Sequence, residues 1–86
     1  MEPLRRYPEG VELNELSKRV FDALCLYTSF PWPILRAQCN RHGVDPANLD
    51  EAGLWRVIPD IASGVARFTS PDKGDLCRRQ LEELLP

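Results

Sequence analysis

The sequence predicts an all-α fold: a compact, irregular bundle of four principal helices joined by proline-led turns. Apolar residues recur at three- and four-residue steps, and the alternation typical of strands never persists over a useful length. Several of the 8 prolines in the 86-residue chain also stand where a helix would begin. We expect residues 1–10 to form an irregular N-terminal arm and residues 11–86 to form a single helical domain.

The first helix is predicted over residues 12–28, where an apolar stripe runs between charged positions. Its members are Leu13, Leu16, Val20, Ala23, Leu24 and Tyr27. The helix has to end before Pro31, because the residue ahead of a proline avoids the α conformation. We therefore expect residues 29–33 to form a stiff loop. The second helix is then predicted over residues 33–42, with Gly43 as its left-handed cap.

The third helix is predicted over residues 49–69 and is the most apolar segment, with Leu54, Trp55, Val57, Ile58, Ile61, Ala62, Val65, Ala66 and Phe68. Pro59 removes one helical hydrogen bond and crowds the carbonyl of Trp55, so we expect a kink or break near Pro59. Gly64 would permit close approach of another helix, from this chain or from a second copy.

The fourth helix is predicted over residues 71–85, because Ser70 can cap it and Pro71 suits its first position. Acidic residues follow near its positive end, as the helix dipole favours. We expect its buried face to consist of Leu76, Cys77, Gln80, Leu81, Leu84 and Leu85.

Composition points to a soluble globular domain. The chain is 43% hydrophobic and 28% charged, and no apolar run reaches the ~20 residues of a membrane-spanning helix. We expect a cytoplasmic protein with no membrane partner. Its 3 cysteines are too few and too scattered for a disulfide framework and are expected to be reduced. A net charge of −2 argues against a protein that binds the phosphate backbone of nucleic acid.

No motif for catalysis or cofactor binding is found in the sequence. The five glycines lie apart from one another, so neither standard phosphate-binding loop is present. Cys39 and His42 share a helix face at i and i+3, but Cys39 is best explained as a small core residue, and His42 suits a helix C-terminus. We expect no enzyme activity, no catalytic residue, no cofactor and no metal site.

Protein binding fits the residues best. The segment Phe30-Pro31-Trp32-Pro33 places aromatic side chains on a restricted backbone, where docking costs little entropy. Arg36 and Arg41 follow within one to two turns and can donate hydrogen bonds to a partner. We predict a non-enzymatic interaction module, regulatory or adaptor in role, that binds another protein or a second copy of itself through Phe30, Trp32, Arg36 and Arg41. Trp32 could instead close the core, and Trp55 is expected to be buried.

Two alternatives remain at this stage. The helix, glycine turn and helix around Gly43 have the outline of a helix-turn-helix, which would bind duplex DNA in a salt-dependent manner through Arg36 or Arg41. The segment that would read the bases is acidic and apolar, however. A small Cys-dependent or metal-binding protein would instead show unusual reactivity, or bound metal, at Cys39.

Overall fold

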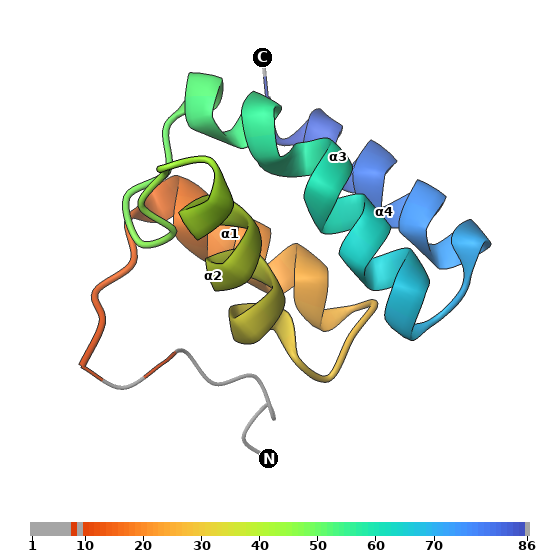
Figure 1. Ribbon diagram of the computed structural model, residues 1–86. Helices are drawn as coiled ribbons and strands as arrows, with labels where there is room; N and C mark the ends of the chain where they lie inside the picture. Colours follow the sequence, from red (N-terminus) through yellow and green to blue (C-terminus); the bar gives the residue numbers. More distant parts are fainter. Residues whose placement is uncertain (1–7, 9, 86) are drawn as a thin grey trace.

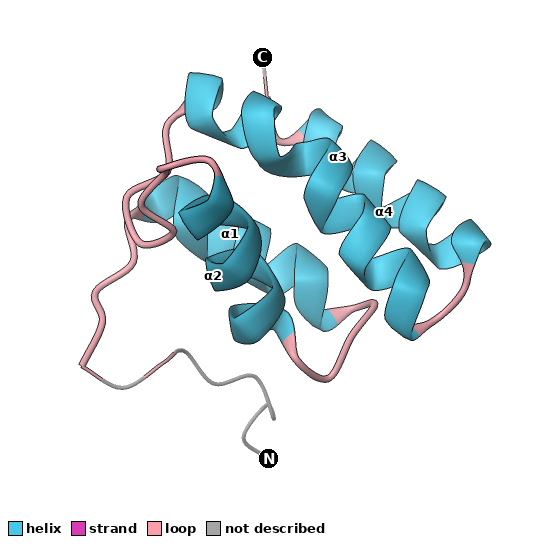
Figure 2. Cartoon of the chain, viewed as in Figure 1, coloured by secondary structure: helices cyan, strands magenta, loops and turns pink. Residues whose placement is uncertain are grey.

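The computed structural model describes residue 8 and residues 10–85, and these residues form four α-helices. The helices are α1 (Glu15–Cys25), α2 (Pro31–Arg41), α3 (Glu51–Phe68) and α4 (Pro71–Glu83). No strand occurs within the described residues, which confirms the all-α fold (Figure 2). The predicted N-terminal arm, residues 1–10, lies outside the described residues except for Pro8 and Gly10.

The helices pack in the cyclic order α1, α2, α3, α4, and α4 closes the ring against α1. The α3–α4 pair is the most extensive of these interfaces, and α4 runs back alongside α3 after a two-residue turn (Figure 1). No described helix combines the length and the apolar character that crossing a membrane requires.

The centre of the bundle is lined by branched aliphatic side chains from all four helices. Fully buried members include Leu24 from α1, Leu35 from α2, Ile61 from α3 and Leu81 from α4. Burying such a side chain contributes about 1.5–3 kcal/mol. The apolar stripe of each helix therefore determines which face of that helix turns towards the centre of the bundle.

A polar cluster joins the start of α1 to the segment before α3. Asn14 caps α1 through its side-chain oxygen, which accepts from the Ser17 amide at 2.8 Å. The Asn14 side-chain amide donates to the Leu49 carbonyl at 2.9 Å, and the Ser17 hydroxyl accepts from the Leu49 amide at 3.0 Å. Ser17 is fully buried, so these bonds replace water for both groups. They attach the α2–α3 connection to α1.

The predicted stiff loop over residues 29–33 is wrong, because α2 begins at Pro31 and includes Trp32 and Pro33 in its first turn. The first amides of a helix have no partner within the helix, so prolines at these positions cost no hydrogen bond. Gly43 has a φ of 67° after the end of α2, which confirms the predicted left-handed cap.

α3 is one continuous helix through Pro59, so the break we allowed for near this residue does not occur. Trp55, whose carbonyl loses its helical donor at Pro59, and Pro59 itself are both exposed. Water can therefore hydrogen-bond the freed carbonyl, and the cost of the proline does not force the helix apart.

Gly64 and Gly74 both lie where two helices pack together, but only at Gly74 is there no room for a side chain. A Cβ on Gly64 would lie 3.4 Å from Ile34 Cγ2 of α2, an ordinary van der Waals contact. A Cβ on Gly74 of α4 would lie 2.7 Å from Ala66 Cβ and 2.8 Å from the Ala62 carbonyl oxygen of α3. The helix that approaches Gly64 thus belongs to this chain, and the closest approach occurs at Gly74.

Three residues expected on the apolar faces of their helices are exposed, and Phe68, the most exposed of them, is described with the candidate site below. Trp55 is 52% exposed and Leu76 is 51% exposed. Trp55 lies at the edge of the buried stripe of α3, one turn before the exposed Pro59, and a tryptophan is often too large to be fully covered there. Leu76 precedes the buried Cys77, which takes the core position on that turn of α4.

Candidate functional site

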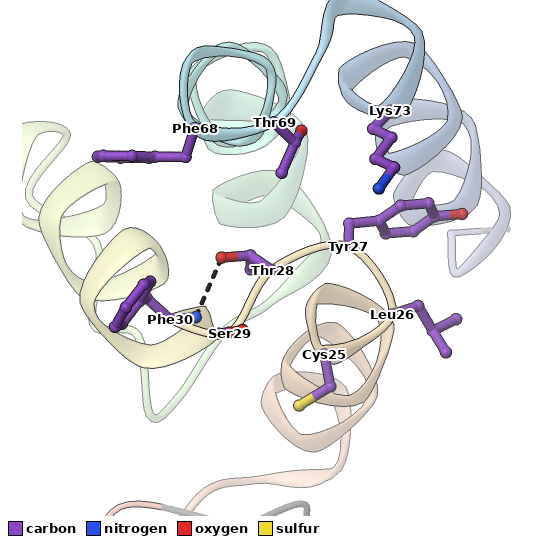
Figure 3. A pocket seen from close by; sticks show the side chains of 9 residues that line it. All are labelled: Cys25, Leu26, Tyr27, Thr28, Ser29, Phe30, Phe68, Thr69 and Lys73. Atoms are coloured by element: carbon purple, nitrogen blue, oxygen red, sulfur yellow. Dashed lines mark hydrogen bonds between the residues drawn. The ribbon is translucent and has the colours of Figure 1, made fainter.

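A cleft of about 430 Å³ opens between the α1–α2 connection and the α3–α4 corner. We call it the aromatic cleft (Figure 3). One wall comes from the end of α1 and the residues that follow it, and the other from the last residue of α3 to the first turn of α4. It is lined by Cys25, Leu26, Tyr27, Thr28, Ser29, Phe30, Phe68, Thr69 and Lys73.

The most exposed large apolar side chains of the described residues all line this cleft. Phe68 is 69% exposed, Phe30 63% and Leu26 62%. Single exposed apolar residues are normal on a protein surface, whereas large contiguous patches of them are often binding surfaces. The rings of Phe68 and Phe30 extend to one side of the lining and the Leu26 side chain to the other (Figure 3). The rim here is polar, with the hydroxyl groups of Thr28, Ser29 and Thr69.

Phe68 lies on the core-facing side of its helix, yet the other described elements leave its ring exposed. The residues three, four and seven positions before it, Val65, Gly64 and Ile61, are all buried. Residues at these spacings share one face of a helix, so Phe68 continues the core-facing side of α3. Its ring is exposed because the aromatic cleft lies where the next packing partner would be.

The backbones that carry the two phenylalanines are fixed. The Phe30 amide donates to the Thr28 hydroxyl at 3.0 Å, and its carbonyl accepts from the Ile34 amide at 3.3 Å. After Phe68, both the amide and the hydroxyl of Thr69 donate to the Val65 carbonyl, at 2.9 and 2.6 Å. Aromatic rings on such rigid backbones lose little conformational freedom when a partner docks.

Lys73 gives the aromatic cleft a positive charge. Among the described residues that line the cleft, it is the one with a formal charge at neutral pH, and it extends from the first turn of α4 towards Tyr27 (Figure 3). Its amide donates to the capping hydroxyl of Ser70 at 3.3 Å, which fixes the backbone at this point. Within residues 8 and 10–85, no acidic side chain forms an ion pair with Lys73.

The predicted partner-binding residues lie in three different places. Phe30 lines the aromatic cleft, whereas Trp32 and Arg36 line a second hollow of about 370 Å³ with Pro33, Ala37 and Asn40. Trp32 is half-buried and packs against the core, and its part in binding a partner stays a prediction. Arg41 lies at the far end of α2, where it is exposed.

His42 joins that far end of α2 to the middle of α3. Its Nε2 donates to Asp60 Oδ2 at 2.5 Å, because a carboxylate can only accept. This hydrogen bond lowers the pKa of the Asp60 carboxyl, and the charges of His42 and Arg41 act in the same direction. His42 thus holds a helix-to-helix contact in this structure.

The Cys39 thiol is buried. Burial and the nearby charge of Asp45 raise its pKa to about 11. At neutral pH the group is therefore a thiol, whereas nucleophiles and metal ligands are thiolates. Among the described residues, no three side chains of His, Cys, Asp or Glu gather in a way that could hold a metal ion.

The start of α3, which a helix-turn-helix would present to DNA, is acidic. Asp50 caps the helix by accepting from the Gly53 amide at 2.7 Å, and Glu51 is the first helical residue. Both side chains are exposed. Carboxylates at this position repel phosphates, so the start of α3 lacks the base- and phosphate-binding side chains that a helix-turn-helix presents to DNA.

Sequence reasoning missed Leu26, Phe68 and Lys73 as lining residues of the cleft. The apolar spacing places Phe68 on the core-facing side of its helix, and this is where it lies, but its side chain is exposed rather than buried. For Lys73 the sequence indicated only a place in the first turn of α4, because this residue follows the capping Ser70 and Pro71. Nothing in the sequence indicated that this turn faces the α1–α2 connection.

No family model, no curated protein and no solved structure matches this chain.

Proposed function

We propose that the chain is a non-enzymatic protein-interaction module, regulatory or adaptor in role, that binds a partner protein through the aromatic cleft. The proposal rests on one observation: the three most exposed large apolar side chains among the described residues, Leu26, Phe30 and Phe68, line the same cleft. Trp32 and Arg36, next along the chain from Phe30, provide a second contact area beside it.

The two exposed rings of the aromatic cleft can supply only part of the free energy that binding a partner requires. Full burial of a phenylalanine contributes about 1.5–3 kcal/mol, and Phe30 and Phe68 each have roughly two thirds of that surface left to bury. Together they offer about 2–4 kcal/mol, while association costs at least about 4 kcal/mol. The two rings alone therefore do not outweigh the cost of association, so binding needs further contacts, such as those that the second hollow can provide.

Affinity capture with matched variants tests the proposal. The protein is immobilised as wild type, as a Phe30→Ser/Phe68→Ser double variant, and as a Trp55→Ser control. Trp55 is an exposed aromatic outside the aromatic cleft, so its removal changes the exposed apolar surface without altering the cleft. Circular dichroism establishes that each variant is folded.

The expected result is a partner retained by the wild type and by Trp55→Ser but lost by the double variant, with binding reproduced between the purified proteins. Equal capture by all three proteins would contradict the proposal. A second copy of the chain is the alternative partner. Sedimentation across a concentration series would identify it, as association of the wild type that the double variant abolishes.

A further inference from the structure

The electrostatic character of the aromatic cleft differs from that of the protein as a whole. The chain has a net charge of −2, yet among residues 8 and 10–85 no acidic residue lines either the aromatic cleft or the hollow beside Trp32. Of these described residues, Lys73 carries the one formal charge in the first lining, and Arg36 the one in the second. The first turn of α2, between the two linings, contains no acidic residue either.

The volume of the cleft restricts what can enter it. At about 430 Å³ it falls near the lower end of the range for small-molecule pockets, about 300–1,000 Å³. A space of this size accepts one or two large side chains of a partner. The occupant therefore reaches the aromatic rings through a protruding segment.

We infer that the occupant of the aromatic cleft is a short protein segment that combines one or two large apolar side chains with a carboxylate positioned to pair with Lys73. This inference rests on the proposed function and adds the chemistry of the partner. Phe30 and Phe68 cover the apolar side chains, and the Lys73 ammonium pairs with the acidic group at the rim. Complementary charge of this kind selects among partners and speeds encounter more than it raises affinity.

A second copy of the chain docked through the same face is a poorer occupant. A two-fold symmetric contact brings a surface patch against itself, and the described residues of the two linings offer no acidic side chain that could pair with Lys73 of the other copy. Two ammonium groups in one partly desolvated interface repel each other. An acidic partner segment has no such conflict.

The experiment selects peptides from a phage-displayed library of random peptides of about 12 residues on the immobilised wild-type protein. Selected peptides are synthesised with a fluorescent label, and their dissociation constants are measured by fluorescence polarisation at low and high salt. Each peptide is measured against the wild type, Lys73→Met, Phe68→Ser and Lys18→Met. Lys18 is an exposed lysine on α1 that does not line the cleft, so it is the matched control.

The expected peptides contain a large apolar residue near Asp or Glu. Their affinity falls about twofold to fivefold with Lys73→Met, as for an exposed ion pair, and is unchanged with Lys18→Met. Phe68→Ser removes most of the binding. The salt dependence seen with the wild type is weaker with Lys73→Met, because one screened pair has been lost.

Three results would overturn the inference. Peptides that require Phe68, lack acidic residues and are insensitive to Lys73→Met would reject the acidic partner while leaving the proposed function in place. Acidic peptides weakened equally by Lys18→Met would show general attraction rather than pairing at the cleft. Peptides that bind without any dependence on Phe68 would overturn both the inference and the proposed function.

Discussion

Replacing Gly64 and Gly74 by alanine, one at a time, should change stability in opposite directions. Both glycines lie inside helices, where alanine is preferred by about 1 kcal/mol. At Gly64 the new Cβ would meet Ile34 Cγ2 at 3.4 Å, so nothing has to move. We expect Gly64→Ala to raise the free energy of unfolding by about 0.5–1 kcal/mol.

At Gly74 the same change creates a clash. The Cβ would lie 2.7 Å from Ala66 Cβ and 2.8 Å from the Ala62 carbonyl oxygen, whereas apolar atoms settle at about 3.5–4.0 Å. Because the neighbours are helix backbone and a Cβ rather than a flexible side chain, α3 and α4 have to separate. Such overpacking costs about 1–3 kcal/mol. After the helix preference is subtracted, Gly74→Ala should lower the free energy of unfolding by up to about 2 kcal/mol.

Urea denaturation followed by circular dichroism measures both changes, and thermal midpoints should separate by about 4–8 °C for each kcal/mol of difference. Adding Ala66→Gly to Gly74→Ala removes one of the two close contacts, while the Ala62 carbonyl remains. The double-mutant cycle should therefore show a favourable coupling but only partial recovery. Gly74→Ala as stable as Gly64→Ala would refute the close approach of α3 and α4.

Three further substitutions test other features of the fold. Ser17→Ala should cost about 1–3 kcal/mol in urea denaturation, because the amide of Leu49 loses its buried acceptor. Pro59→Ala should raise the free energy of unfolding by about 1–3 kcal/mol, since it restores the amide that the Trp55 carbonyl lacks. Asp60 has a lowered pKa in the folded state, so its stabilising effect is present above its unfolded pKa of about 3.9 and lost as pH falls. Asp60→Asn should therefore lose less stability than the wild type between about pH 5 and pH 3 in denaturation at stepped pH.

For each of these three substitutions, a specific result would contradict the prediction. A neutral Ser17→Ala would mean that another group or water satisfies the Leu49 amide. A destabilised Pro59→Ala would mean that the stiffness of proline in the unfolded chain outweighs the missing hydrogen bond. An Asp60→Asn variant with the acid sensitivity of the wild type would show that the contact with His42 does not favour the ionised carboxylate.

The helices themselves could be predicted because their signals are local. A stripe at three- and four-residue spacing, a cap such as Asp50 or Ser70 and a stop such as Gly43 depend only on nearby residues, and all appear in the structure. The start of α2 was predicted too late in the chain, because proline suits both a loop that follows one helix and the first turn of the next helix. Pro31 begins α2, whereas α1 already ends at Cys25.

The candidate site was predicted only where a single segment carries it. Phe30, Trp32 and Arg36 come from one stretch of sequence, and each lines one of the two hollows described above. The opposite wall of the aromatic cleft comes from residues about forty positions later. Sequence patterns define the apolar side of a helix, but they do not reveal how far along that side its neighbours extend.

Phe68 and Trp55 illustrate why this difference matters for function. Both are aromatic residues of α3, and both are exposed. Trp55 stands at the edge of the buried stripe, so its exposure follows from its position on the helix and requires no partner. Phe68 continues the fully buried face of Val65 and Ile61, so its exposure shows that the packing among the described residues ends before it does on that face. A residue directed into the core but left uncovered is better evidence for a docking site than one that is merely exposed, and for this reason Phe68 rather than Trp55 carries the functional proposal.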